Sequence, residues 1–452
     1  MKVAAALLAG GAAGSEASFS VFAQSLDQAW VEQALRATGT ATIRRRKLPA
    51  EYVVWLVIGM AMLRDRSIAE VVRHLDLVMP TPTGERQQVS GSAVVQARDR
   101  LGPEPLAWLF HSTAAVWASA SADEHRWRDL AVLGVDGSTL RVPDTPENDA
   151  HFGRAGTSRG EAAAAYPQLR LVTLMVLRSH LLLDLAFGPY RNGELSLAQQ
   201  LWPQLPQRSL LIVDREFATY ENFQTLSDPT QQRYWLTRAK QLHMAALRIM
   251  QKLGPGDALV ELRPSKYTRK LHPGLPETLT VRAVQYQRKG FKPQTLLTSL
   301  LDPVAFPAAE IIALYHERWE LELTYDEIKT HTLEREEASL RCKTPERVSQ
   351  ELWGLALAYN LVRLTMAEVA RRAGALPNQI SYRHTLHFVR AFWISAWLAS
   401  PGVLPKRLQS LYNELPLLLL PPRRNRAYPR AVKIKMSNYL RKRPRSHTNG
   451  AN

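Results

Sequence analysis

The sequence predicts a mixed α/β protein with helical regions at both ends. Apolar residues run without a break through LLIV just before Asp214, as in a strand that is buried on both faces. Strand-like and helix-like segments alternate between residues 129 and 240, and this alternation is typical of an α/β sheet. Residues before 126 and after Pro307 instead carry apolar side chains at helical spacing.

Length and charge narrow the class of protein. A chain of 452 residues is too long for one compact core, so we expect two to four domains. Its 58 Lys and Arg against 41 Asp and Glu leave a net charge of +17, which indicates a polyanionic partner, most commonly nucleic acid. No apolar run of about 18 residues is present, so we expect no membrane partner.

Cysteine usage points to a reduced compartment. Cys342 is the single cysteine, which excludes disulfides and cysteine-based zinc sites within the chain. A cytoplasmic location fits this composition. The N-terminal MKVAAALLAGGAAG resembles a weak secretory signal, but its Gly and Ala content and the basic chain favour a protein that is not exported.

Residues 1–125 are predicted to form an N-terminal helical DNA-binding domain. The expected helices are 48–63, a segment that follows Ser67, and a segment that follows Ser90 or Ser92 and stops at Gly102. Three short helices with basic residues on the third resemble a helix-turn-helix bundle.

The third of these helices carries the predicted DNA contacts. It offers Gln96, Arg98 and Arg100 to a groove, and a basic run at residues 44–47 precedes the bundle. A plain helical bundle with a solvated polar face explains the same residues equally well.

Residues 126–240 form the first part of the predicted α/β core. The expected strands are 130–142 (interrupted at Asp-Gly-Ser), 169–177, 181–188, 209–214 and 234–239, with helices over 194–205 and from Tyr220. His180 lies between the second and third strands.

The rest of the chain divides into three predicted parts. Residues 241–307 read as a β-rich insertion, with short strands at 258–264, 279–287 and 295–301. Residues 308–372 are the second part of the core, and they are helical. Residues 373–452 are a C-terminal helical region with a tail that has no acid after Glu414 but many cations for phosphate (Arg423, Arg424, Arg426, Arg430, Lys433, Lys435, Arg441, Lys442, Arg443, Arg445).

Two carboxylates follow apolar strands. Asp136 comes after LAVLGV, and Asp214 comes after LLIV. A carboxylate at a strand end projects from the edge where ligands usually bind in α/β folds. Two such groups would repel each other unless a divalent cation lay between them. The alternative is that each acid only caps a strand or a turn, and Asp-Gly is a common turn signal.

A third carboxylate lies on the predicted helix over 308–331. At about 100° per residue, one stripe of roughly 60° holds four side chains (Tyr315, Arg318, Glu322, Lys329). Glu317, Glu320 and Glu327 fall elsewhere, so Glu322 is the acid that a helix packed on the sheet could direct at the other two. The alternative is an amphipathic helix with ordinary ion pairs.

Three converging carboxylates can hold two Mg²⁺ ions for in-line displacement at phosphorus, with Mn²⁺ as a substitute. Arg318 and Lys329 would then bind phosphates, and Tyr315 could bind a phosphate or stack on a base.

The spacing Y-x2-R-x3-E-x6-K resembles the signature of the insertion-element-four family of DDE transposases. The segments DGSTLRVPDTPENDAHFG, VDREFATYENF and ELWGLALAYNLVR also look like that family. The resemblance implies an RNase H-like core with a β-strand insertion, and cut-and-paste movement of a bacterial insertion sequence. It makes Asp136, Asp214 and Glu322 the metal ligands, and Tyr315, Arg318 and Lys329 their DNA-contacting partners.

The resemblance also implies the partners. These are double-stranded DNA, as terminal inverted repeats and target, and a second copy of the chain on paired ends, in a bacterial cytoplasm where bound protein joins the nucleoid. Two positions depart from the pattern: Glu216 replaces a small residue, and a base-stacking Trp of one relative aligns near Gln294. Stacking then falls to another aromatic (Tyr286, Phe291 or Trp235).

Other readings stay open at this point. Asp184 and Asp302 are alternative acids for the ligand set. An RNase H-like nuclease without strand transfer, or a non-catalytic DNA-binding regulator, would share many of these features.

Overall fold

The computed structural model describes residues 26, 28–41, 48–75, 77, 88–157, 160–240, 243–244, 247–288, 291–334, 339–396, 414 and 418–421. The N-terminal signal-like segment, the basic run at 44–47 and the basic tail lie outside the described residues.

The N-terminal region is helical, as predicted. Its described helices are α3 (Gln28–Ala37), α4 (Ala50–Met62), α5 (Ile68–His74), α6 (Gly91–Leu101) and α7 (Glu104–Glu124). The predicted caps are confirmed: Ser67 and Glu70 form a capping box on α5, Ser90 accepts from Ala93 N on α6, and Gly102 ends α6 with φ 69°.

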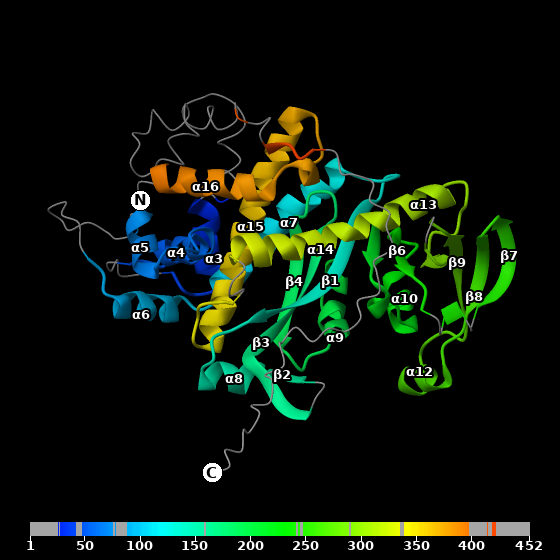
Figure 1. Ribbon diagram of the computed structural model, residues 1–452, viewed down its shortest axis with the longest axis horizontal. Helices are drawn as coiled ribbons and strands as arrows, with labels where there is room; N and C mark the ends of the chain where they lie inside the picture. Colours follow the sequence, from blue (N-terminus) through cyan, green and yellow to red (C-terminus); the bar gives the residue numbers. More distant parts are fainter. Residues whose placement is uncertain are drawn as a thin grey trace, which may run out of the picture.

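One mixed sheet forms the centre of the molecule (Figure 1). Its strand order is β2-β3-β1-β5-β6-β10-β9-β8-β7. Strand β4 pairs with β3 on the side opposite β1. The strands are β1 (Ala131–Arg141), β2 (Arg154–Thr157), β3 (Gly160–Val176), β4 (Leu182–Pro189), β5 (Ser209–Val213), β6 (Arg233–Arg238), β7 (Arg248–Gly254), β8 (Asp257–Leu262), β9 (Leu279–Tyr286) and β10 (Gln294–Thr298).

Strand β1 has neighbours of both orientations. It pairs antiparallel with β3 and parallel with β5, which in turn is parallel to β6. The expected interruption at Asp-Gly-Ser is wrong, because Asp136, Gly137 and Ser138 all pair with β3. The ladder to a long antiparallel neighbour overrides the local turn preference of Asp-Gly.

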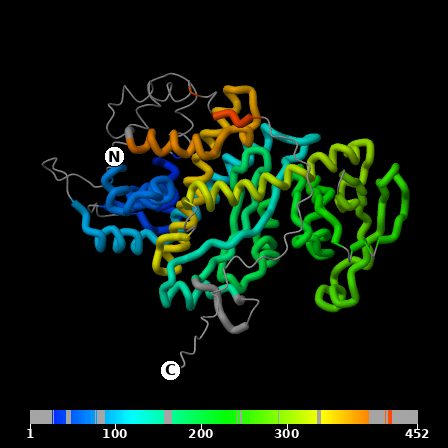
Figure 2. The backbone as a smooth tube through the Cα atoms, in the orientation of Figure 1, coloured from blue at the N-terminus to red at the C-terminus, as the bar shows by residue number. Residues whose placement is uncertain are grey.

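The strands in residues 241–307 continue this sheet. β10 pairs antiparallel with β6, β9 pairs with β10, and β8 and β7 follow outward. Figure 2 shows this part of the chain as one extended lobe beside the strands of the core.

Helices cover the sheet. The remaining helices are α8 (Pro146–Phe152), α9 (Glu194–Gln199), α10 (Tyr220–Leu226), α12 (Lys266–Leu271), α13 (Ala308–Tyr315), α14 (Trp319–Asp326), α15 (Pro345–Ala373) and α16 (Tyr382–Ala396). Short 3-10 turns are η1 (Trp202–Gln204), η2 (Arg215–Phe217), η3 (His316–Arg318) and η5 (Pro377–Gln379), and η4 (Glu327–Thr332) is a π-helix.

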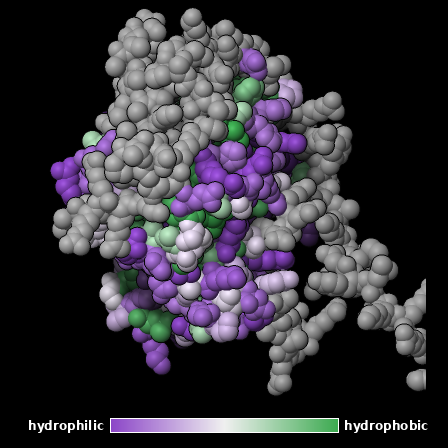
Figure 3. Space-filling model, turned by 90° about the vertical axis from the view of Figure 1, so that its left-hand side faces the viewer, coloured by the Kyte–Doolittle hydropathy of each residue, from purple (hydrophilic) through white to green (hydrophobic). Residues whose placement is uncertain are grey.

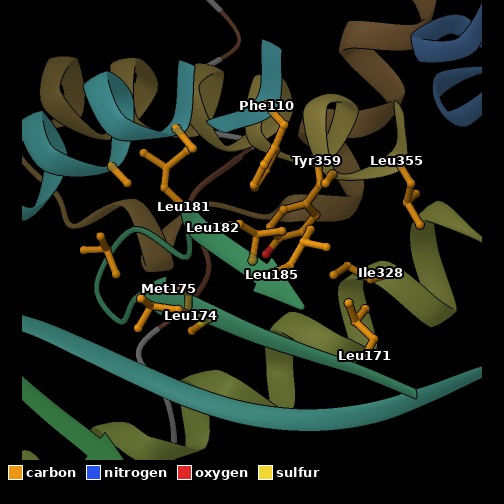
Figure 4. Packing of buried hydrophobic residues seen from close by; sticks show 14 of the residues in the cluster. Phe110, Leu171, Leu174, Met175, Leu181, Leu182, Leu185, Ile328, Leu355 and Tyr359 are labelled. Atoms are coloured by element: carbon orange, nitrogen blue, oxygen red, sulfur yellow. The ribbon is translucent and has the colours of Figure 1, made fainter. Parts of the chain in front are cut away.

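The long helix α15 packs against α4 and α7, so the N-terminal helices share a core with the C-terminal half. A Cβ placed on Gly354 would lie 2.6 Å from the Val57 side chain, which shows how closely α15 and α4 approach. Beneath α15, apolar side chains of β3, β4 and the turn between them meet α7 and α15 (Figure 4; Leu171, Leu174, Met175, Leu181, Leu182, Leu185, Phe110, Leu355, Tyr359).

On the face shown in Figure 3, hydrophilic residues predominate and hydrophobic ones form small patches. Among the described residues no helix has both the length and the apolar character needed to span a bilayer.

Candidate active site

Asp136 and Asp214 lie beside each other on paired strands. Val135 and Val213 form the last parallel pair between β1 and β5, and the two aspartates are the next residues on each strand. Neighbouring strands are about 4.8 Å apart, so both carboxylates start from adjacent backbones. The strand register thus brings the two acids side by side. Only Asp214 follows the end of its strand, however, because β1 continues through Asp136 to Arg141, so the prediction that Asp136 ends a strand is wrong.

Helix α14 lies along β1 in a fixed register. Leu321 packs at Gly134, where an added Cβ would lie 2.9 Å from its Cδ2. The Tyr325 hydroxyl donates to the Asp136 carbonyl at 2.6 Å, and Lys329 Nζ donates to Ser138 Oγ at 2.5 Å. Four helical residues rise about 6 Å and two strand residues about 6.8 Å, so each helical turn meets the next residue on the same face of β1.

Arg318 joins the second and third acids. Its Nη1 lies 3.5 Å from Asp214 Oδ2, and its Nη2 lies 3.2 Å from Glu322 Oε1. Burial alone would lower the pKa of Arg318, but Tyr315 and the nearby carboxylates outweigh it and raise that pKa. Within the described ranges no three His, Cys, Asp or Glu side chains are grouped so as to hold a metal ion. The guanidinium is the cation between Asp214 and Glu322.

The Asp136 carboxyl is hard to ionise. Burial raises its pKa to about 6, and Asp214 and Glu194 add to this effect. The Gly137 N–H, which donates to Asp136 Oδ1 at 2.9 Å, and Arg318 oppose it. A bound cation would stabilise the ionised form, because an opposite charge nearby favours a carboxylate.

Tyr315 and Lys329 are close to these acids but belong to different segments. Tyr315 is buried at the end of α13, and burial raises the pKa of its hydroxyl. Burial lowers the pKa of Lys329, while Asp136 opposes that change.

The helix predicted over 308–331 is present, but it is not a regular α-helix throughout. The 3-10 turn η3 separates α13 from α14, and the π-helix η4 contains Lys329. Irregular helical turns of this kind occur where tertiary contacts override the i to i+4 pattern, and π-segments are frequent at functional sites. A constant 100° per residue therefore does not describe the whole segment.

A buried ionic cluster behind α14 was not predicted. His180 Nε2 lies 2.8 Å from Glu320 Oε2, and Arg363 binds both His180 Nδ1 and Glu327. Because the guanidinium can only donate, Nδ1 accepts and Nε2 carries the proton. Burial would raise the pKa of Glu327, but Arg363 outweighs it and the pKa falls to about 2. The only hint of this cluster in the sequence is Arg363 itself, a charged residue within an apolar helical segment.

Arg98 corrects the predicted DNA contacts. It is buried, its Nε donates to Gln350 Oε1 at 2.7 Å, and its Nη2 donates to Cys342 Sγ at 3.2 Å. It shares the inner face of α6 with Val94 and Leu101, which lie four residues before and three after it. It therefore cannot reach a DNA groove, whereas Gln96 and Arg100 are exposed on the outer face.

The alternative acids have structural roles elsewhere. Asp184 is buried, 3.1 Å from His111 Nε2, and accepts from Leu185 N. Asp302 accepts from Val304 N and Ala305 N in a turn before α13. Neither contacts Asp136, Asp214 or Glu322 among the described residues.

The aromatic candidates for base stacking differ in their burial and contacts. Trp235 is fully buried and stacked on Phe223 at 4.1 Å, so it is not available to a base. Tyr286 is half-buried, and its hydroxyl donates to Gln294 Oε1 at 3.0 Å. It packs edge-on against His316, the residue after Tyr315, and is thus near the active site.

Residues 127–361 match the transposase DDE domain, which makes the chain a DDE transposase. Residues 16–111 match the insertion element 4 transposase N-terminal region, and the chain belongs to the insertion element 4 family of transposases. It is a DNA-transposing enzyme with a mixed α/β catalytic domain, as the sequence predicted.

Relatives support the same family. The transposase InsG for insertion sequence element IS4 of Escherichia coli (strain K12) is 41% identical over 415 residues, which is 92% of each chain. The putative transposase InsZ of the same strain is 32% identical over 280 residues, 60% of this chain and 91% of that one. A piggyBac transposase synaptic complex with hairpin DNA has a TM-score of 0.43 at 10% identity over 92% of this chain and 86% of that chain, a likeness too weak to bear on the site.

Proposed function

We propose that the chain cuts DNA at the ends of an insertion sequence and joins the freed 3′ ends to target DNA. Asp136, Asp214 and Glu322 are its catalytic acids and hold two Mg²⁺ ions, for which Mn²⁺ can substitute. The observation that carries the proposal is the adjacency of Asp136 and Asp214, with Glu322 joined to Asp214 through Arg318.

The donor set fits a hard divalent cation. All three candidate ligands are carboxylates, the oxygen donors that Mg²⁺ prefers. The guanidinium of Arg318 lies between two of these carboxylates, Asp214 and Glu322, so this place attracts a cation. Binding of metal ions requires Glu322 and Asp214 to turn away from this guanidinium.

When bound, the two ions would activate the attacking oxygen and stabilise the leaving oxygen at phosphorus. Asp136 has to give up its proton for this, which links activity to pH. Arg318, once released from the carboxylates, and Lys329 bind phosphate oxygens, and Tyr315 contacts the DNA beside them.

DNA recognition extends beyond the acids. We assign residues 1–125 to binding the terminal inverted repeats, with Arg100 and Gln96 on the exposed face of α6 as contacts. Residues 126–240 and 308–372 form an RNase H-like core, 241–307 its insertion, and 373–452 a basic region for backbone phosphates. Two chains act together on paired ends, in the cytoplasm and on the nucleoid.

The test is strand cleavage by Glu322→Gln on DNA with the terminal repeats of the element. We expect a loss of at least about 100-fold, since one group that stabilises the transition state is worth that much. Asp326→Asn is the matched control, because Asp326 is exposed on the same helix and the charge change is equal.

The outcomes separate the candidate functions. Binding without metal-dependent nicking would indicate a regulator, and cutting that ignores the repeats would indicate a nuclease. Single-end substrates cut as fast as paired ends would contradict action by two chains.

A further inference from the structure

A fourth carboxylate lies against Gly137, the residue that follows Asp136. Glu194 is the first residue of α9, and its carboxylate lies against the backbone of Gly137. A Cβ placed on Gly137 would be 2.6 Å from Glu194 Cδ and 2.8 Å from its Oε2. These distances are shorter than real Cβ contacts, so the Glu194 carboxylate occupies the space of the missing side chain.

Space, not backbone conformation, requires glycine at this position. Gly137 is not among the glycines with positive φ, and it pairs with Val172 inside the regular ladder between β1 and β3. An alanine could adopt this extended backbone. The residue that an alanine would displace is Glu194.

One oxygen of Glu194 is anchored and the other is not. Arg170, on β3 opposite Thr139, donates from Nη1 to Oε1 at 3.0 Å. The Arg170 guanidinium also lies over the Tyr190 ring at 4.8 Å, which fixes the donor. Oε2 has no hydrogen-bond partner among the residues that the structure describes, and it lies at Gly137, where the absence of a side chain leaves only backbone between it and the face of β1 that carries Asp136.

We propose that Glu194 is a fourth carboxylate of the metal site, which it reaches across Gly137. This rests on the proposed function of Asp136, Asp214 and Glu322. Its carboxylate would bind an ion directly or through a metal-bound water, and Arg170 is its positioning residue.

Mn²⁺ binding to the full-length protein, followed by titration calorimetry or electron paramagnetic resonance, tests the proposal. Glu194→Gln keeps the acceptor for Arg170 but removes the charge. We expect Mn²⁺ affinity to fall about 10–100-fold, the usual effect of losing a group that supports a metal site. Glu216→Gln is the matched control, because Glu216 is exposed two residues after Asp214, and it should bind Mn²⁺ as the wild type does.

Gly137→Ala gives a second test in which no acidic residue is replaced. The added methyl should displace Glu194 and weaken Mn²⁺ binding in the wild-type background, but it should add nothing in a Glu194→Ala background, where the space is empty. Such non-additivity is the sign of a direct coupling between two sites. Equal losses in both backgrounds would overturn the proposal.

Asp136→Asn distinguishes this proposal from the proposed function. If Asp136→Asn abolishes Mn²⁺ binding while Glu194→Gln binds normally, the role of Glu194 is wrong and the three acids stand. If Asp136→Asn binds Mn²⁺ like the wild type, the metal site itself is wrong.

Discussion

At the scale of single residues, Asp136 shows how function and stability oppose each other. Its folded pKa of about 6 lies above the ordinary value of 3.8, so the fold disfavours the ionised carboxylate. Below about pH 3 the group is protonated in both the folded and unfolded states and has no effect. Between the two pKa values the unfolded state ionises before the folded state, so the folded state loses about 1–3 kcal/mol of stability, and this loss is complete above pH 6.

We therefore predict that Asp136→Asn is more stable than the wild type in metal-free buffer at pH 8. The difference in unfolding free energy, measured with urea from about pH 3 to 8, should shrink as the pH falls below 6 and vanish near pH 3. Mg²⁺ should stabilise only the wild type, because the ion binds its folded state. A difference that stays constant across this range would contradict the assigned cause.

At the scale of elements, the two faces of α6 have different tasks. Arg98 holds α6 to α15 through Gln350, whereas Arg100 is exposed. We predict that Arg98→Ala lowers the unfolding free energy by about 1–3 kcal/mol, because buried partners lose their hydrogen bonds. Arg100→Ala should leave stability unchanged and weaken binding to terminal-repeat DNA. Equal DNA affinity of Arg100→Ala and wild type would remove α6 from the DNA interface.

The segment α14–η4 depends on the cluster behind it. Arg363 neutralises Glu327 and contacts His180, and all three are shielded from solvent. Arg363→Leu should cost about 3–5 kcal/mol of unfolding free energy, since it leaves a buried carboxylate without its cation. Adding Glu327→Leu should recover part of that loss. A double variant no more stable than the single one would show that the pair is not the cause.

At the scale of the whole molecule, the net charge of +17 governs DNA binding. Each phosphate contact releases counterions, so affinity should fall steeply with salt, by a factor on the order of 10³ between 50 and 200 mM for six or more contacts. Fluorescence anisotropy with the Glu322→Gln protein measures this without cleavage. A nearly flat dependence on salt would mean that phosphate contacts contribute little.

The whole molecule also limits how the chain can be divided. The contacts of α15 with α4 and α7 place N-terminal and C-terminal residues in one core. Residues 1–125, to which we assign binding of the terminal repeats, thus share their core with α15 and do not form a separate folding unit.

The sequence by itself determined the family and the capped N-terminal helices, and it singled out the three acids that we propose as catalytic. The reason is that these signals are local: a cap acts over three residues, a buried strand is a continuous apolar run, and Arg318, Glu322 and Lys329 occupy a fixed spacing on one helical segment.

Only the tertiary structure decided which polar groups are buried and which residues cross between elements. Arg98 looks like a surface cation until α15 covers it, and Gly137 looks like a turn until β3 pairs with it and Glu194 fills its side-chain space. Pairing between β6 and β10, and the contact of Arg363 with His180, join residues far apart in the chain. No periodicity within one segment records such contacts, because they depend on which distant surfaces meet.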